Sequence, residues 1–278
     1  MLASLAVVVA ADLERSLAAG DLESASGLRY LVGKKLPDTS IDLARIGRHG
    51  AGGADFALGV MALHGLAGPR DRPSACALFA SAWDKGFAEA AFRLSGCVAA
   101  SNPTREAVLL EAAAATGHAT ASEQIGRRCL EAKPPDAGCA FARLSAAATG
   151  GRASAKSLLA WMYAQGVGVP ADPARALALY LQAAGAGDLS AKNNLGEMHE
   201  TGRGVPADAV RAAQFYREAA EAGFAPAQFN LGRLYATGNG VPRDAGNARL
   251  WLRAALDGGV APAQKLLDWL DTPPGERR

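Results

Sequence analysis

The chain has 278 residues, of which 29 are Lys or Arg and 27 are Asp or Glu, so its formal net charge at pH 7 is +2. The charges are nearly balanced and the sequence has no local basic run, so it lacks the positively charged surface that binds nucleic acid. We therefore expect no nucleic-acid partner. Aromatic residues make up only 6% of the chain, which leaves few large side chains to build a cavity for a small ligand.

The N-terminal part of the chain carries two separate patterns. Residues 1–11 are apolar and end in small residues of the kind that a signal peptidase accepts. We expect them to direct export, with Asp12 as the mature N-terminus, although no Lys or Arg precedes the run and a helix core is the alternative. The run is too short to span a membrane. Residues 12–52 show a degenerate helical pattern, which predicts an N-terminal capping repeat.

Residues 53–261 predict an array of two-helix repeats, with units that begin at residues 53, 89, 120, 154, 190 and 226. The last three units align without a gap, and each first helix carries Ala and Leu on one face, as Ala155 and Leu159 do. The units at 89 and 120 have altered loops. Residues 262–278 are expected to form a C-terminal capping helix and a tail.

A turn with two glycines followed by Val-Pro separates the helices of each regular unit. Gly166 and Gly168 are one such pair, and glycine permits the positive φ angles that end a helix. An aspartate follows each turn, and its short carboxylate can accept hydrogen bonds from the free amides of a starting helix. The second helices of the regular units are therefore expected to begin at Asp172, Asp208 and Asp244.

Two blocks carry a resemblance to a known family. Ala191–Asp208 reads AKNNLGEMHETGRGVPAD, and Ala227–Asp244 reads AQFNLGRLYATGNGVPRD. Both resemble the Sel1-like repeat (SLR), a relative of the tetratricopeptide repeat. The resemblance implies an all-α fold, a right-handed α/α superhelical solenoid of about six helix-turn-helix repeats with caps at both ends. Ala160 in place of a helical glycine and His199 in place of a tyrosine depart from the family pattern.

The four cysteines form two pairs, each placed symmetrically about its own turn. Cys76 precedes one turn and Cys97 follows it, and Cys129 and Cys139 flank another, so antiparallel packing would bring each pair together. We therefore predict disulfides between Cys76 and Cys97 and between Cys129 and Cys139. Such disulfides would agree with export. The alternative is four buried thiols in a reducing cytoplasm.

No catalytic or metal-binding arrangement is evident. The histidines lie in separate repeats and lack the close spacing to another His, Cys or acid that zinc requires: His49, His64, His118 and His199. No motif that pairs a nucleophile with a base occurs. Glu197, His199 and Glu200 lie on one expected helix and could be imagined as an acid and a base, but His199 occupies a core tyrosine position and we interpret it as a packed residue. We expect no cofactor, no metal and no enzymatic activity.

The first helices of the repeats are expected to line a concave wall, as the resemblance implies. Residues three, seven and eleven places into each unit fall on one stripe of this wall. The binding candidates there are Trp161, Gln165, Asn193, Glu197, Phe229 and Arg233. The same places hold Ser157, Thr201 and Thr237, and nearer the N-terminus Phe56, Val60, His64, Glu123 and Arg127. Trp161, Glu197 and Arg233 vary on a constant frame, which favours a role in specificity.

The sequence therefore predicts a monomeric scaffold or adaptor that binds a protein or peptide segment in its concave groove. The resemblance implies roles in bacterial cell envelope assembly, polysaccharide export or signalling, and the expected location is periplasmic or secreted. Two alternatives remain open. One is a cysteine-rich secreted β-lactam or cell-wall hydrolase, and the other is a cytosolic adaptor in complex assembly or protein turnover.

Overall fold

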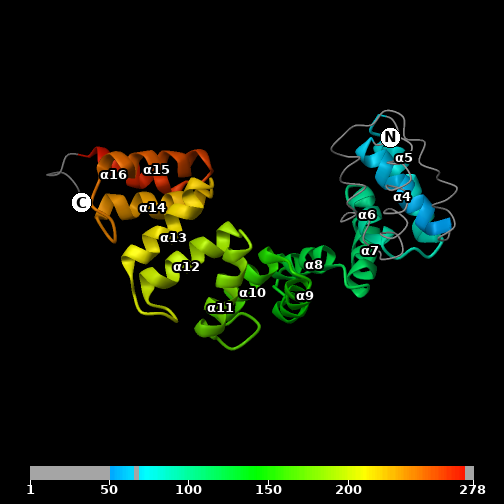
Figure 1. The fold of residues 1–278 in the computed structure, drawn as a ribbon, viewed down its shortest axis with the longest axis horizontal. Helices are drawn as coiled ribbons and strands as arrows, with labels where there is room; N and C mark the ends of the chain where they lie inside the picture. The colour runs from blue at the N-terminus through cyan, green and yellow to red at the C-terminus, as the bar shows by residue number, and fades with distance from the viewer. Residues whose placement is uncertain (1–50, 66–68, 273–278) are drawn as a thin grey trace, which may run out of the picture. The chain divides into compact units, whose positions relative to one another are not determined.

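The structure, a computed structural model, describes residues 51–65 and 69–272, and within these ranges every regular element is an α-helix (Figure 1). The export signal and nearly all of the N-terminal capping repeat that we expect lie outside the described residues. The helices are α4 (Ala51–His64), α5 (Arg72–Asp84), α6 (Ala90–Val98), α7 (Pro103–Ala115), α8 (Ala119–Glu131), α9 (Ala137–Thr149), α10 (Ala153–Gln165), α11 (Pro173–Gly185), α12 (Leu189–Thr201), α13 (Ala209–Glu221), α14 (Ala225–Thr237), α15 (Ala245–Asp257) and α16 (Pro262–Asp271).

The chain divides into two compact units, Met1–Ile125 and Gly126–Arg278. In the first unit, α4 packs on α5, α5 on α6 and α6 on α7. In the second, each helix from α9 to α16 packs on the next. This packing of consecutive helices, without a strand in the described ranges, is the all-α solenoid that the repeat pattern predicts.

The helices of the regular units begin and end where their capping residues stand. The side chains of Asp172, Asp208 and Asp244 each accept a hydrogen bond from a backbone N–H in the first turn of α11, α13 and α15, respectively. Pro173 occupies the first position of α11, where its missing N–H costs nothing. The first helices α10, α12 and α14 end at left-handed glycines, with φ of 70° at Gly166, which follows α10.

The second glycine of each turn fixes how one repeat sits on the preceding one. A Cβ added at Gly204, which has φ of 76°, would lie 2.9 Å from the carbonyl oxygen of Pro173, the first residue of α11. The same addition at Gly240 would meet the carbonyl oxygen of Ala209, the first residue of α13. The turn therefore packs directly on the backbone of the preceding second helix, and only glycine leaves room for that approach.

Alanines make up much of the buried core and let the helices approach closely. Ala155, Ala191, Ala227 and Ala263 are fully buried at equivalent places of α10, α12, α14 and α16. Larger side chains, such as Leu195 and Tyr216, fill the spaces between the helices. Because each helix pair covers only part of its own apolar surface, stability depends on contacts between neighbouring repeats.

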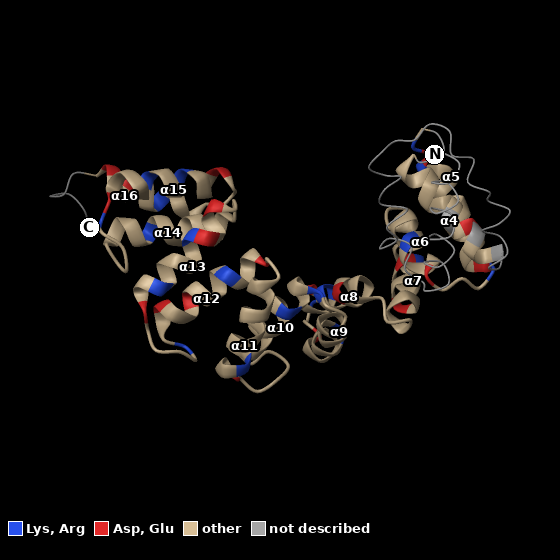
Figure 2. Cartoon of the chain, in the orientation of Figure 1, with Lys and Arg blue, Asp and Glu red and all other residues tan. Residues whose placement is uncertain are grey.

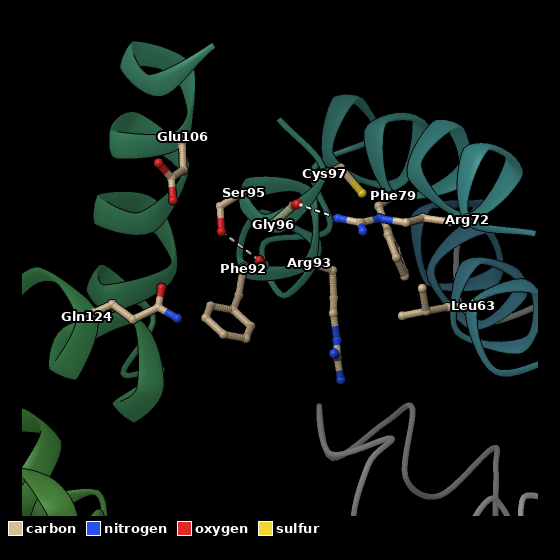
Figure 3. Close-up of a pocket in the computed structure, with 10 residues that line it drawn as sticks. All are labelled: Leu63, Arg72, Phe79, Phe92, Arg93, Ser95, Gly96, Cys97, Glu106 and Gln124. Atoms are coloured by element: carbon tan, nitrogen blue, oxygen red, sulfur yellow. Dashed lines mark hydrogen bonds between the residues drawn. The ribbon is translucent and has the colours of Figure 1, made fainter. Parts of the chain in front are cut away.

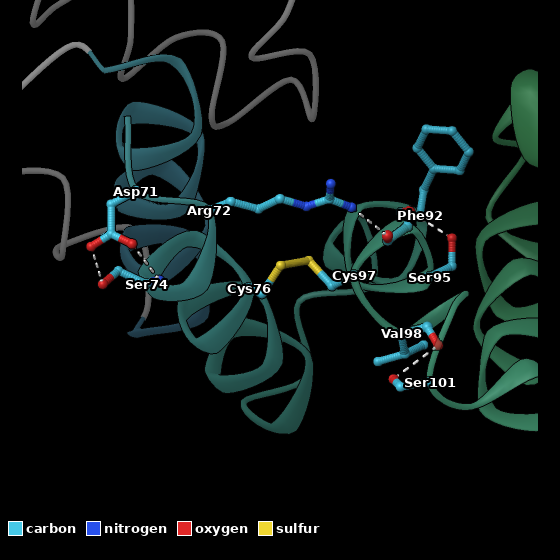
Figure 4. The surroundings of a disulfide bond; sticks show 10 residues. Asp71, Arg72, Ser74, Cys76, Phe92, Ser95, Cys97, Val98 and Ser101 are labelled. Carbon is cyan, nitrogen blue, oxygen red and sulfur yellow. Dashed lines mark hydrogen bonds between the residues drawn. A yellow bond between two sulfur atoms is a disulfide. The ribbon is translucent and has the colours of Figure 1, made fainter. Parts of the chain in front are cut away.

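Both expected cysteine pairs are joined in the structure. Cys76 of α5 bonds to Cys97 of α6 with a Cα–Cα distance of 5.7 Å (Figure 4). Cys129 of α8 bonds to Cys139 of α9 with a Cα–Cα distance of 5.9 Å. Both distances lie in the range that disulfides require. Each bond therefore links two consecutive helices across the turn between them.

Candidate functional site

Three of the predicted binding residues lie together at the surface of the second unit. Trp161 and Gln165 stand one turn apart on α10, and Glu197 stands on α12, the next first helix along the chain. All three are exposed, and Trp161, at 38%, is one of few large apolar side chains in the described ranges with so much accessible surface. An exposed aromatic beside a carboxylate and an amide offers both apolar contact and hydrogen bonds.

These three residues line a cavity of about 300 Å³ between α10, α11 and α12. The other lining residues come from the same helices and the turn after α12: Ala164, Pro173, Tyr180, Asn194, Met198, Thr201 and Arg203. Tyr180 and Met198 are buried. Charged residues of both signs are spread over the helices of this unit (Figure 2). The charge at the cavity itself comes from the charged residues that line it, Glu197 and Arg203. We call this cavity the α10–α12 pocket.

Some polar groups in the α10–α12 pocket already have a hydrogen-bond or ion-pair partner within the protein, and others do not. The Glu197 carboxylate forms no hydrogen bond or ion pair with another described residue, whereas Arg203 donates from Nη2 to the carbonyl oxygen of Ala164 at 2.7 Å. The pKa of the Tyr180 phenol is raised, mainly by burial and to a smaller extent by the negative charge of Glu197. The phenol also forms a hydrogen bond with the Asn194 side chain. Tyr180 therefore keeps its proton, and Glu197 is the acceptor without a partner.

Arg233, the third member of the predicted specificity set, is already engaged. Its Nη2 donates to Oε2 of Glu200 at 2.6 Å, and the Tyr216 hydroxyl donates to the same oxygen at 3.0 Å. Burial raises the pKa of Glu200, but the hydrogen bonds and the charge of Arg233 outweigh it and hold the pKa below its ordinary value. Replacing Arg233 would therefore disturb the contact between α12 and α14 as well as the surface.

Several other stripe positions are less open than the helical spacing predicts. Phe229 is half-buried against the apolar cluster that contains Leu252 and Leu267, and Asn193 accepts a hydrogen bond from Asn230 Nδ2 at 2.9 Å. Buried side chains also occur at the equivalent places Ser157, Phe56, Val60 and Glu123. These four side chains are therefore not open to a partner on the wall. In the second unit the first helices also contact one another, α10 with α12 and α14 with α16, which covers part of the stripe.

A second cavity, of about 310 Å³, lies in the first unit and was not predicted from the sequence (Figure 3). Phe79, Phe92 and Arg93 line it, together with Leu63, Arg72, Ser95, Gly96, Cys97, Glu106 and Gln124. Arg72 donates to the carbonyl oxygen of Gly96 at 3.1 Å, and the Phe92 ring stacks on His118 with centroids 4.1 Å apart. Of the lining residues, the sequence analysis pointed only to Cys97, as half of a predicted disulfide.

The histidines and acidic residues of the described ranges do not gather into a metal site. No group of three or more His, Cys, Asp and Glu among them could hold a metal ion. His199 is buried and stacks on Phe215 with centroids 5.5 Å apart, as expected for a core position. None of the described helices is both long enough and apolar enough to cross a membrane.

The Sel1 repeat family matches this chain over residues 53–87, 153–188, 189–224 and 225–260, which together make up just over half of its length. The search among curated proteins found no match. The matches contain the whole α10–α12 pocket.

Two solved structures with the same fold extend this likeness. A protective antigen of uropathogenic Escherichia coli strains, which displays an SLR fold, gives a TM-score of 0.67 at 26% identity, covering 80% of this chain and 49% of its own. A Sel1 repeat protein from Oxalobacter formigenes gives 0.65 at 27% identity, covering 73% of this chain and 84% of its own. The chain thus spans about half the length of the Escherichia coli antigen.

Proposed function

Because the chain belongs to the Sel1 repeat family, whose repeats mediate protein interactions, we propose that it is a non-enzymatic scaffold that captures a partner segment at the α10–α12 pocket. The observation that supports this site is the exposed Trp161 on the rim of a cavity that Gln165 and Glu197 also line. Aromatic side chains of this kind carry a large share of the binding energy at protein interfaces.

The size of the pocket favours a side chain of a protein over a cofactor. Its volume of about 300 Å³ stands at the lower limit of ligand pockets, which range over roughly 300–1,000 Å³. A partner segment that crosses α10 and α12 would place one side chain in the pocket and its backbone near Gln165 and Thr201 at the rim. The rest of the segment would extend along the neighbouring first helices.

The disulfides favour an oxidising compartment for this interaction. Disulfides persist in the periplasm and outside cells and are rare in the cytosol. The two bonds that join α5 to α6 and α8 to α9 support a periplasmic or secreted scaffold. We propose that this scaffold acts in bacterial envelope assembly, polysaccharide export or signalling.

Site-specific photocrosslinking in cells tests the site. A photoreactive amino acid at Gln165 should form an adduct with one partner, whereas the same group at Leu250 should not, because Leu250 is exposed on α15 away from the pocket. Trp161→Ala should abolish the Gln165 adduct and weaken binding of the purified partner about thirtyfold, the equivalent of a 2 kcal/mol anchor.

The matched control is Leu250→Ala, which also removes an exposed apolar side chain but leaves the pocket intact. It should bind the partner as the unmodified protein does. An adduct at Gln165 that persists in a folded Trp161→Ala variant with unchanged affinity would show that the partner binds elsewhere.

A further inference from the structure

Two successive interfaces between first helices of the second unit, α10 with α12 and α12 with α14, carry different charged groups. The α10–α12 pocket lies between two first helices and over the buried Tyr180 of α11. One repeat later, α12 and α14 meet over the buried Tyr216 of α13. The α12–α14 interface can therefore be compared with the α10–α12 pocket, because its charged residues are paired.

In the α12–α14 interface an acid and a base of the chain pair with each other. Glu200 of α12 pairs with Arg233 of α14 at 2.6 Å, and the Tyr216 hydroxyl donates to the same carboxylate oxygen at 3.0 Å. Asn239, in the turn after α14, lies 3.5 Å from the other carboxylate oxygen. A buried or half-buried ion pair that gathers such hydrogen bonds is well satisfied.

In the α10–α12 interface the same places hold different residues. Ala164 stands where Glu200 stands one repeat later, so the acid that would fill the space is absent. Glu197 stands where Arg233 stands, so the sign of the charge at that place is reversed. The result is a cavity of about 300 Å³ with a carboxylate on its wall that has no cation among the described residues.

We propose that the α10–α12 pocket binds a basic side chain, Arg or Lys, of the partner segment, which pairs with Glu197 while its aliphatic stem lies on Trp161. This specificity rests on the function proposed above. Basic side chains combine an apolar stem with a charged end, and an indole ring attracts a cation over its face. Arg suits the site best, because its planar guanidinium can bond both carboxylate oxygens.

Arg203 is the cation already present in the pocket, and its position leaves Glu197 unpaired. Its guanidinium donates to the carbonyl oxygen of Ala164 in the last turn of α10, where the helix dipole is negative. Asn239 holds the equivalent place one repeat later. Arg203→Asn should therefore remove a repelling charge and strengthen binding of a basic side chain.

A small-molecule probe can test the proposal without the partner. The full chain, labelled with nitrogen-15, is titrated with N-acetyl-arginine methylamide, and the indole N–H signal of Trp161 is followed, assigned with Trp161→Phe. The matching citrulline compound has the same shape and no charge. The arginine probe should bind about tenfold more tightly than the citrulline probe, and Glu197→Gln should remove that difference.

A variant that copies the neighbouring interface provides a second test. Ala164→Glu combined with Glu197→Arg places in the pocket the pair that Glu200 and Arg233 form one repeat later. It should keep its helical content and lose the response of Trp161 to the arginine probe. If this variant does not fold, the comparison of the arginine and citrulline probes in Glu197→Gln still tests the proposal.

Three results would overturn the proposal. They are equal binding of the arginine and citrulline probes, an unchanged preference in Glu197→Gln, and tighter binding of N-acetyl-glutamate methylamide than of the arginine probe. Partner capture that depends on Trp161 but not on the charge of Glu197 would refute the basic side chain and leave the scaffold function standing. Capture that depends on neither would refute the site itself.

Discussion

His199 shows how a single residue can depart from the repeat pattern and change the response of the protein to pH. It occupies the place in α12 that Tyr163 holds in α10, and its Nδ1 has no hydrogen-bond partner among the described residues. Burial, followed by the charge of Arg211, lowers the pKa of His199, and Asp208 only partly opposes this. One repeat earlier, Arg175 lies over the uncharged ring of Tyr163, 4.6 Å from its centroid.

The lowered pKa predicts that His199 makes the fold less stable in acid. The unfolded chain takes up a proton near its ordinary pKa of 6.5, while the folded chain does not until lower pH. The free energy of unfolding therefore falls as pH drops below about 6.5 and stops falling below the folded pKa. In His199→Tyr, which restores the residue of the neighbouring repeats, this part of the fall should disappear.

Urea unfolding of both proteins at pH 7 and at about pH 5.5 measures the effect, since His titrates in this range. The difference between the two proteins isolates His199 from the carboxylates, which titrate alike in both. The same pH dependence in the two proteins would contradict a neutral, buried imidazole.

At the scale of the helix pair, the turn after each first helix decides the register between repeats. Gly240 has φ of 70°, and a Cβ there would meet the carbonyl oxygen of Ala209. Gly259 has φ of 88°, and a Cβ there would have no atom within 4 Å. Both glycines need the left-handed conformation, but only Gly240 also needs the missing side chain for packing.

Alanine substitutions at these two glycines separate the conformational cost from the packing cost. Gly259→Ala should cost about 1 kcal/mol, for the left-handed conformation alone. Gly240→Ala should cost about 1–3 kcal/mol more, because overpacking against a backbone carbonyl moves α14 relative to α13. Chemical denaturation of each variant gives the two values. Equal costs would show that the turn is free to move away from α13.

At the scale of the whole molecule, each compact unit carries one disulfide. Cys76–Cys97 lies in the unit Met1–Ile125, and Cys129–Cys139 lies in the unit Gly126–Arg278. In a repeat array each helix contacts mainly its neighbours, so the effect of a local cross-link stays close to it. Each bond should therefore stabilise its own unit.

Removing the second disulfide tests this division. Cys129→Ser combined with Cys139→Ser should lower the free energy of unfolding by about 2–3 kcal/mol, as loop-entropy estimates give for a short loop. Hydrogen exchange should rise in α9 and α10 and stay unchanged in α5 and α6. Before this, mass mapping of the native protein under non-reducing conditions should find the two pairs intact. Free thiols or crossed pairs would contradict both the bonds and the proposed compartment.

The sequence by itself determined the repeat fold, the ends of the regular helices and the cysteine pairs. These features depend on residues close together in the chain: Asp172 caps the helix that follows it, and Gly166 ends the helix before it. Cys129 and Cys139 pair across a single turn. Short-range rules therefore suffice for them.

Only the tertiary structure decided which residues of the stripe are open for binding. Trp161, Glu197 and Arg233 hold the same place in successive repeats, yet Arg233 is paired with Glu200 and Glu197 is not paired with any described residue. The difference comes from Ala164 and Glu200, which lie on the preceding helix of each interface. Exposure and charge pairing depend on side chains a whole repeat apart, and the spacing within one helix carries no information about them.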